Sequence, residues 1–84
     1  MTCTVEILRS VQRQLAKIDR QDRPRIITAI RGLASDPRPA GSKKLSGRPA
    51  WRIRVGVYRV IYEIADDRLL VLVVVIGHRK EVYR

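Results

Sequence analysis

Six side chains in the second half of the sequence could act together on one substrate: Arg52, Arg54, Arg59, His78, Arg79 and Tyr83. Guanidinium groups bind phosphate oxygens and neutralise the negative charge that builds on phosphorus during phosphoryl transfer. A tyrosine ring can stack on an unstacked base, and histidine is the side chain whose ordinary pKa lies nearest neutrality. The set therefore predicts chemistry on a phosphodiester, with RNA as the substrate class.

The overall charge points to a polyanionic partner. The chain has 18 Lys and Arg against 8 Asp and Glu, a formal net charge of +10. The negatively charged partner could be nucleic acid, an acidic protein or an anionic membrane. Residues 37–62 hold seven of the basic residues and no acidic one. In the expected loop over 38–50, we expect three of them to contact mRNA or rRNA: Lys43, Lys44 and Arg48. A solvated basic face is the alternative for such a loop.

Several other kinds of site are excluded by the composition. One cysteine and one histidine cannot build a metal site, and no glycine-rich phosphate loop is present. A Ser-His-Asp triad would have only His78 as its base, and the sequence contains no nucleophile-elbow pattern around a serine. We therefore expect neither a metal nor a small-molecule cofactor.

The cellular setting is expected to be the cytoplasm. The lone Cys3 cannot form an internal disulfide, and the first residues lack the basic and apolar regions of a signal peptide. The apolar run at 69–76 is eight residues long, whereas a membrane span needs about 20. We expect a buried strand there and no contact with a membrane.

Three β-rich runs must position the arginines. They are separated by Gly56 and by Asp66-Asp67, which is typical of consecutive strands joined by turns. Side chains alternate along a strand, so Arg52 and Arg54 should share the face opposite to Trp51, Ile53 and Val55. The run at 69–76 is apolar on both faces, as expected of a central strand.

The first half of the chain predicts a short strand and a helical hairpin. Residues 4–8 favour a strand, and Ser10 is a candidate N-cap for a helix whose apolar stripe is Val11, Leu15 and Ile18. Asp22 and Pro24 suit the start of a second helix that stops near 35–37, with a stripe of Ile26, Ile27, Ile30, Leu33 and Ala34. The expected fold is one α+β domain, residues 1–84, of order β-α-α-β-β-β. Its helical hairpin packs on a twisted, mainly antiparallel four-stranded sheet whose other face is basic.

Two segments give the sequence a family resemblance. The first segment is residues 45–62, Leu-Ser-Gly-Arg-Pro-Ala-Trp-Arg-Ile-Arg-Val-Gly-Val-Tyr-Arg-Val-Ile-Tyr. The second is residues 73–83, Val-Val-Val-Ile-Gly-His-Arg-Lys-Glu-Val-Tyr. Together with the helical hairpin and Ala-Ser-Asp-Pro-Arg-Pro at 34–39, the chain resembles RelE-type toxins of the RelE/ParE toxin–antitoxin superfamily.

The resemblance implies a ribosome-dependent endoribonuclease that cuts mRNA in the ribosomal A site without a metal. The 2′-hydroxyl attacks its own 3′-phosphate and leaves a 2′,3′-cyclic phosphate and a 5′-hydroxyl end. By position, Arg59 matches the phosphate-binding arginine, Arg79 the residue that stabilises the transition state or protonates the leaving group, and Tyr83 the residue that stacks on the base. The implied resting partner is an acidic, RelB-like antitoxin.

Two positions depart from the family pattern. Arg52 and Arg54 stand where the family often has lysine, and arginine does not deprotonate in proteins. His78 is therefore the candidate general base. Two other functions stay open: a ParE-like toxin that inhibits DNA gyrase and cuts nothing, and a catalytically idle nucleic-acid-binding domain.

Overall fold

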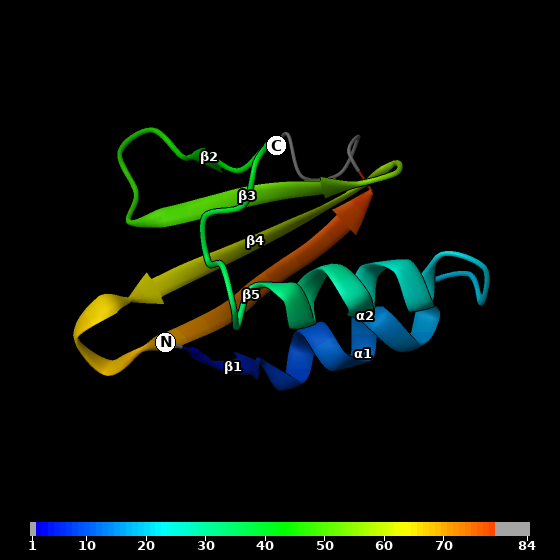
Figure 1. Ribbon diagram of the computed structural model, residues 1–84. Coiled ribbons are helices and arrows are strands. Elements are labelled where there is room, and N and C mark those ends of the chain that lie inside the picture. Colours follow the sequence, from blue (N-terminus) through cyan, green and yellow to red (C-terminus); the bar gives the residue numbers. More distant parts are fainter. Residues whose placement is uncertain (1, 79–84) are drawn as a thin grey trace.

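Two helices cover one face of a five-stranded sheet in the computed structural model of the protein, which describes residues 2–78 (Figure 1). In chain order the elements are β1 (Thr4–Ile7), α1 (Arg9–Lys17), α2 (Arg23–Gly32), β2 (Lys43–Lys44), β3 (Ala50–Val55), β4 (Tyr58–Ala65), the 3-10 turn η1 (Asp66–Arg68) and β5 (Leu70–His78). The predicted α+β class is confirmed. The strand count is corrected from four to five, because Lys43 and Lys44 of the expected loop pair with β3.

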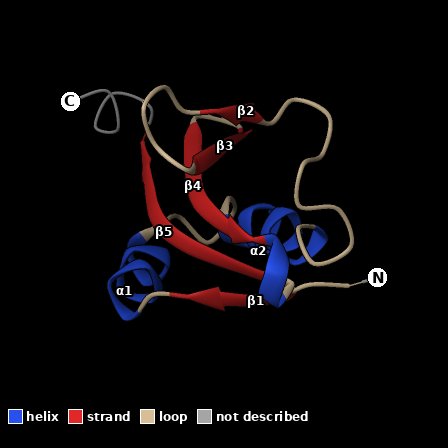
Figure 2. Cartoon of the chain, turned by 90° about the vertical axis from the view of Figure 1, so that its left-hand side faces the viewer, coloured by secondary structure: helices blue, strands red, loops and turns tan. Residues whose placement is uncertain are grey.

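The strand order is β1-β5-β4-β3-β2, and Figure 2 shows the sheet twisting from β1 to β2. β1 runs parallel to β5, whereas the other neighbouring strands are antiparallel. β5 thus lies inside the sheet, flanked by the first strand and by β4. Val71 and Val73 are fully buried on the face that the helices cover, whereas Leu70 and Leu72 on the opposite face are half-buried.

α1 is amphipathic and packs on β5. Val11 and Leu15 are buried, as is Ile18 just after the helix. The helix begins at Arg9, two residues before the position expected from Ser10 as N-cap. Leu8 takes the cap position instead, with no side-chain hydrogen bond, because the chain enters the helix directly from β1.

α2 follows the predicted stripe more closely. Ile26, Ile30 and Leu33 are buried, Asp22 holds the N-cap position, and Pro24 lies in the first turn. The Asp22 side chain makes no capping hydrogen bond, so it does not accept from the free backbone N–H groups of the first helical turn. The helix ends at Gly32, short of the expected 35–37. No helix within residues 2–78 is long and apolar enough to cross a membrane.

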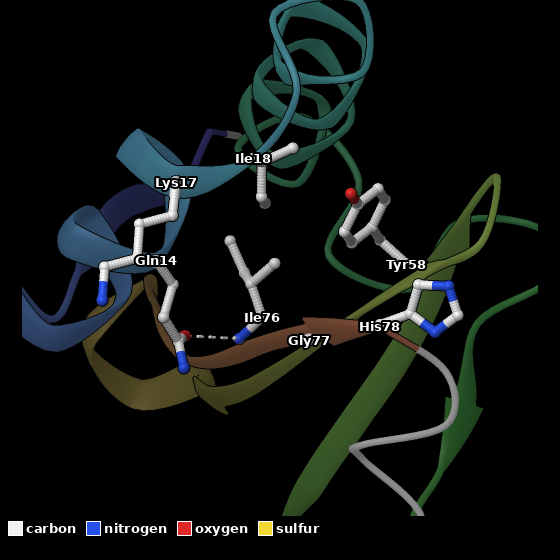
Figure 3. A pocket seen from close by; sticks show the side chains of 7 residues that line it. All are labelled: Gln14, Lys17, Ile18, Tyr58, Ile76, Gly77 and His78. Atoms are coloured by element: carbon white, nitrogen blue, oxygen red, sulfur yellow. Dashed lines mark hydrogen bonds between the residues drawn. The ribbon is translucent and has the colours of Figure 1, made fainter.

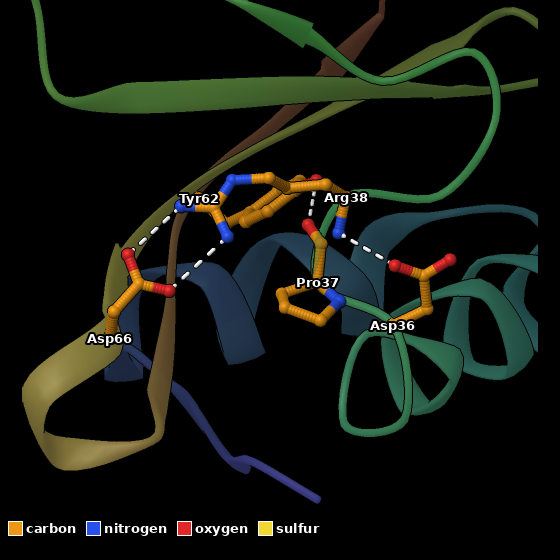
Figure 4. A network of polar contacts seen from close by, with 5 residues as sticks. All are labelled: Asp36, Pro37, Arg38, Tyr62 and Asp66. Atoms are coloured by element: carbon orange, nitrogen blue, oxygen red, sulfur yellow. Dashed lines mark hydrogen bonds and ion pairs between the residues drawn. The ribbon is translucent and has the colours of Figure 1, made fainter. Parts of the chain in front are cut away.

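A polar cluster ties the connection between α2 and β2 to the sheet (Figure 4). The hydroxyl of the fully buried Tyr62 donates to the carbonyl oxygen of Pro37 at 2.7 Å. Arg38 donates to both carboxylate oxygens of Asp66 at 2.9 and 3.2 Å, and its guanidinium lies 5.0 Å from the centre of the Trp51 ring. The hydrogen bonds from Arg38 hold the pKa of Asp66 below its usual range, whereas burial raises the pKa of Tyr62. These contacts fix the loop between α2 and β2 against β4 and η1.

Candidate functional site

Three of the predicted arginines share the face of the sheet that points away from the helices. Arg52 and Arg54 are two residues apart on β3, so both project to the same side, and Trp51, Ile53 and Val55 pack with the core on the other side. Arg59 of β4 pairs directly with Arg54 across the two strands. Directly paired residues project to the same side of a sheet. We call Arg52, Arg54 and Arg59 the arginine face.

The loop lysines are divided by β2. Lys43 pairs with Arg52 and therefore adds a fourth positive charge beside the arginine face. Lys44 pairs with Trp51, on the opposite side of the sheet. Arg48 is exposed in the loop before β3 and is not held by a strand. Of these three predicted RNA contacts, only Lys43 is thus placed beside the arginines.

Burial makes the arginine face electrostatically unusual. Arg52 is 7% exposed and Arg59 is 6% exposed, whereas Arg54 is exposed. Burial lowers the pKa of Arg52, and the positive charge of Arg54 lowers it further. Within residues 2–78, no carboxylate lies within ion-pair distance of Arg52. A buried cation without a carboxylate partner is costly, so this position favours the binding of an anion.

His78 lies on the other face of the sheet. It pairs with Tyr58 at the end of β5, and the two rings meet edge to face with centroids 6.0 Å apart. Arg59, the next residue of β4, pairs with Gly77. The strand register therefore separates His78 from the arginine face, and the general base predicted for it would have to act around the end of the strand.

The other two predicted site residues cannot be placed. Arg79 and Tyr83 lie outside the described residues, and the roles expected of them stay predictions. In residues 2–78, no three histidine, cysteine, aspartate or glutamate side chains gather where they could hold a metal ion. The chemistry that the arginine face can offer is therefore charge neutralisation and positioning of a phosphodiester.

A cavity near His78 was not expected from the sequence. It lies between α1 and the end of β5 and is lined by Gln14, Lys17, Ile18, Tyr58, Ile76, Gly77 and His78 (Figure 3). The apolar stripe of α1 indicated which side of the helix is buried. It carried no signal that Gln14 and Lys17 would face the last residues of a strand more than 50 positions later.

Residues 5–83 match the family model described as the ParE toxin of the type II toxin–antitoxin system parDE. A comparison with curated protein sequences gave no match. Among solved structures, the RelE–RelB complex of the archaeon Pyrococcus horikoshii is 26% identical, with a TM-score of 0.84, covering 94% of this chain and 97% of that one.

Two bacterial structures are similar at lower identity. The RelBE2 toxin–antitoxin complex of Mycobacterium tuberculosis is 24% identical, with a TM-score of 0.83 and coverage of 94% of this chain and 93% of that one. A variant of the E. coli toxin RelE in the free state is 23% identical, with a TM-score of 0.81 and coverage of 99% and 92%. At these identities the likeness shows a shared fold, and that fold is the one of RelE toxins.

Proposed function

Because the chain belongs to the ParE toxin family of type II toxin–antitoxin systems, within the RelE/ParE superfamily, we propose that it is a toxin that cuts mRNA in the ribosomal A site. The observation that carries this proposal is Arg52. Its guanidinium is nearly buried, has no carboxylate partner within residues 2–78, and shares a face with Arg54 and Arg59. A fold built only to bind another protein has no need of such a cluster at a desolvated position.

The proposed reaction is an internal transesterification. The 2′-oxygen of one nucleotide bonds to its own 3′-phosphorus, the bond from phosphorus to the 5′-oxygen of the next nucleotide breaks, and the proton of the 2′-hydroxyl passes to a base. The products are a 2′,3′-cyclic phosphate and a 5′-hydroxyl end. The arginine face neutralises the extra negative charge of the pentacoordinate phosphorus. Electrostatic stabilisation of this kind is usually the largest single contribution to enzyme catalysis.

The remaining roles belong to residues near the C-terminus. We propose that Arg79 stabilises the transition state, that the leaving 5′-oxygen takes its proton from water, and that Tyr83 stacks on the substrate base. His78 stays the candidate base predicted from the sequence, although the register of β5 turns it away from the arginine face. No metal takes part in these steps.

We propose an acidic, RelB-like antitoxin as the resting partner. Solved structures of RelE toxins from P. horikoshii and M. tuberculosis contain their antitoxins. The net charge of +10 and the arginine face would be neutralised by an acidic segment of such a protein. The same positive charge favours association with the ribosome, whose surface is rich in RNA phosphate.

Primer extension on ribosomes programmed with a defined mRNA tests the cleavage. The wild-type chain should cut within the A-site codon, and Arg59→Ala should lower the rate about 10²–10³-fold, as the loss of one donor to a developing charge does. Arg31→Ala, which removes an exposed arginine of α2, is the matched control and should cut normally. Intact transcripts with the wild-type protein would refute the proposal.

A gyrase inhibitor is the second candidate, and the match to the ParE family model favours it. This function would leave mRNA uncut and would induce the DNA-damage response when the chain is expressed. It would also be insensitive to Arg59→Ala unless that side chain touches gyrase. The two readouts, cleaved mRNA and DNA-damage induction, separate the candidates in one expression experiment.

A further inference from the structure

The cavity between α1 and β5 has two unlike walls (Figure 3). Its volume is about 400 Å³, within the range of small-molecule sites. The rings of Tyr58 and His78 form one wall, at the ends of β4 and β5. Gln14 and Lys17 of α1 form the other, and Ile18 and Ile76 supply apolar surface between them.

A hydrogen bond fixes the distance between the walls. β1 pairs with β5 only as far as Val73, so within residues 2–78 the outer edge of β5 beyond that residue has no neighbouring strand. The side-chain oxygen of Gln14 accepts the backbone N–H of Ile76 at 3.2 Å and holds α1 against this edge. The amide nitrogen of Gln14 has no partner within residues 2–78 and remains a donor for a ligand.

The lining matches a nucleobase better than a protein side chain. Among the described residues, two rings, an ammonium group and an amide line the cavity, and no carboxylate does. Flat rings and apolar surface accept an unstacked base, and a lysine at the rim accepts the attached phosphate. Of the residues that the structure describes, an acidic peptide would meet one lysine here, whereas the arginine face and Lys43 offer four cations.

Two residues that line the cavity are direct neighbours of Arg59 in the arginine face, Gly77 by strand pairing and Tyr58 by sequence. Gly77 lines the cavity, and its backbone pairs with Arg59. Tyr58 precedes Arg59 on β4 and projects to the other side of the sheet. An RNA strand that passes over this end of the sheet would therefore meet both sites in succession.

We propose that this cavity is a base-binding subsite for the mRNA nucleotide next to the scissile linkage. The inference rests on the proposed nuclease function and adds to it a determinant of codon preference. Tyr58 and His78 would hold the ring of the base, Lys17 its phosphate and Gln14 an edge of the base. In this subsite His78 contacts the substrate through its ring.

Cleavage kinetics on programmed ribosomes test the subsite with three variants and a control. His78→Ala and Lys17→Ala should each raise KM about tenfold or more, as the loss of one base stack or phosphate contact does, and should change the ranking of A-site codons. His78→Phe keeps a ring without a titratable nitrogen and should recover the KM lost in His78→Ala. Arg9→Ala removes a cation from α1 outside the cavity and should behave as the wild type.

Four outcomes would overturn the subsite, and each is distinct. KM values and codon rankings for His78→Ala equal to those of Arg9→Ala would show that no base binds there. A loss of kcat in His78→Phe as large as in His78→Ala would make His78 the general base. Weaker binding of the antitoxin with unchanged KM would assign the cavity to the protein partner. A wild-type chain that leaves mRNA intact would remove the nuclease function and this subsite together.

Discussion

Replacing Arg52 with methionine should make the protein more stable and less active. The side chain is 7% exposed, has no carboxylate partner within residues 2–78, and lies two residues from Arg54 on the same strand face. Methionine has a similar length and fills the same space without a charge. The variant therefore removes the electrostatic cost of the arginine while keeping most of its packing.

The size of the effect follows from the strand geometry. Residues two apart on a strand are separated by about 7 Å. Two unit charges at that distance repel by about 0.6 kcal/mol in water and about 2.4 kcal/mol at the effective dielectric of a protein surface. Because Arg52 is buried and Arg54 is exposed, we expect a repulsion of about 1 kcal/mol, to which the desolvation of Arg52 adds. A gain of about 1 kcal/mol raises the melting temperature of a domain of this size by about 4–8 °C.

Urea denaturation at two salt concentrations measures the gain. The stability difference between Arg52→Met and the wild type should shrink as NaCl rises from 0.05 to 1 M, because screening weakens the repulsion. Arg54→Met is the control: this side chain is already hydrated, so its replacement should stabilise less. Cleavage by Arg52→Met should fall about 10²–10³-fold. A less stable Arg52→Met protein, or a gain that salt leaves unchanged, would refute the reasoning.

Three further predictions concern the fold. Tyr62→Phe should lower the free energy of unfolding by about 0.5–1.5 kcal/mol, because the hydrogen bond to the carbonyl oxygen of the half-buried Pro37 is lost; urea denaturation measures the loss, and cleavage should be unchanged. Arg38→Gln should be slightly less stable than the wild type near pH 7. Arg38 lowers the pKa of Asp66 in the folded state. The ion pair therefore stabilises the protein fully above the pKa of Asp66 in the unfolded state, about 3.9, and this stabilisation is lost as the pH falls through the pKa of Asp66 in the folded state. Thermal melts from pH 7 to pH 2 should show the two proteins converge. Ile26→Ala should cost about 2–5 kcal/mol and, in so small a domain, should leave part of the protein unfolded at 37 °C, which circular dichroism would show.

The sequence predicted most of what positions the arginine face. The alternation of Trp51, Arg52, Ile53 and Arg54 indicated two unlike faces of β3, and the turn at Gly56 indicated that Arg59 would return beside them. Both signals are local, because the period of a strand and the chemistry of a tight turn involve only neighbouring residues.

Features that depend on distant residues were missed. β2 is two residues long, and two lysines carry no strand pattern, so only their pairing with Trp51 and Arg52 reveals them. His78 was grouped with the arginines because it is close to Arg79 in sequence. Its face of the sheet depends on the register between β4 and β5, which includes a shift between Ile61 and Tyr62. No sequence pattern near His78 indicated that shift.

The parallel pairing of β1 with β5 has a consequence for synthesis on the ribosome. Thr4 leaves the tunnel long before its partner Leu70. β4 likewise lacks its inner neighbour until β5 has emerged, so the arginine face cannot be held rigidly before β5 has been made. Contacts between the two ends of a chain also form slowly. Any activity that depends on the arginine face is therefore delayed until β5 has joined the sheet.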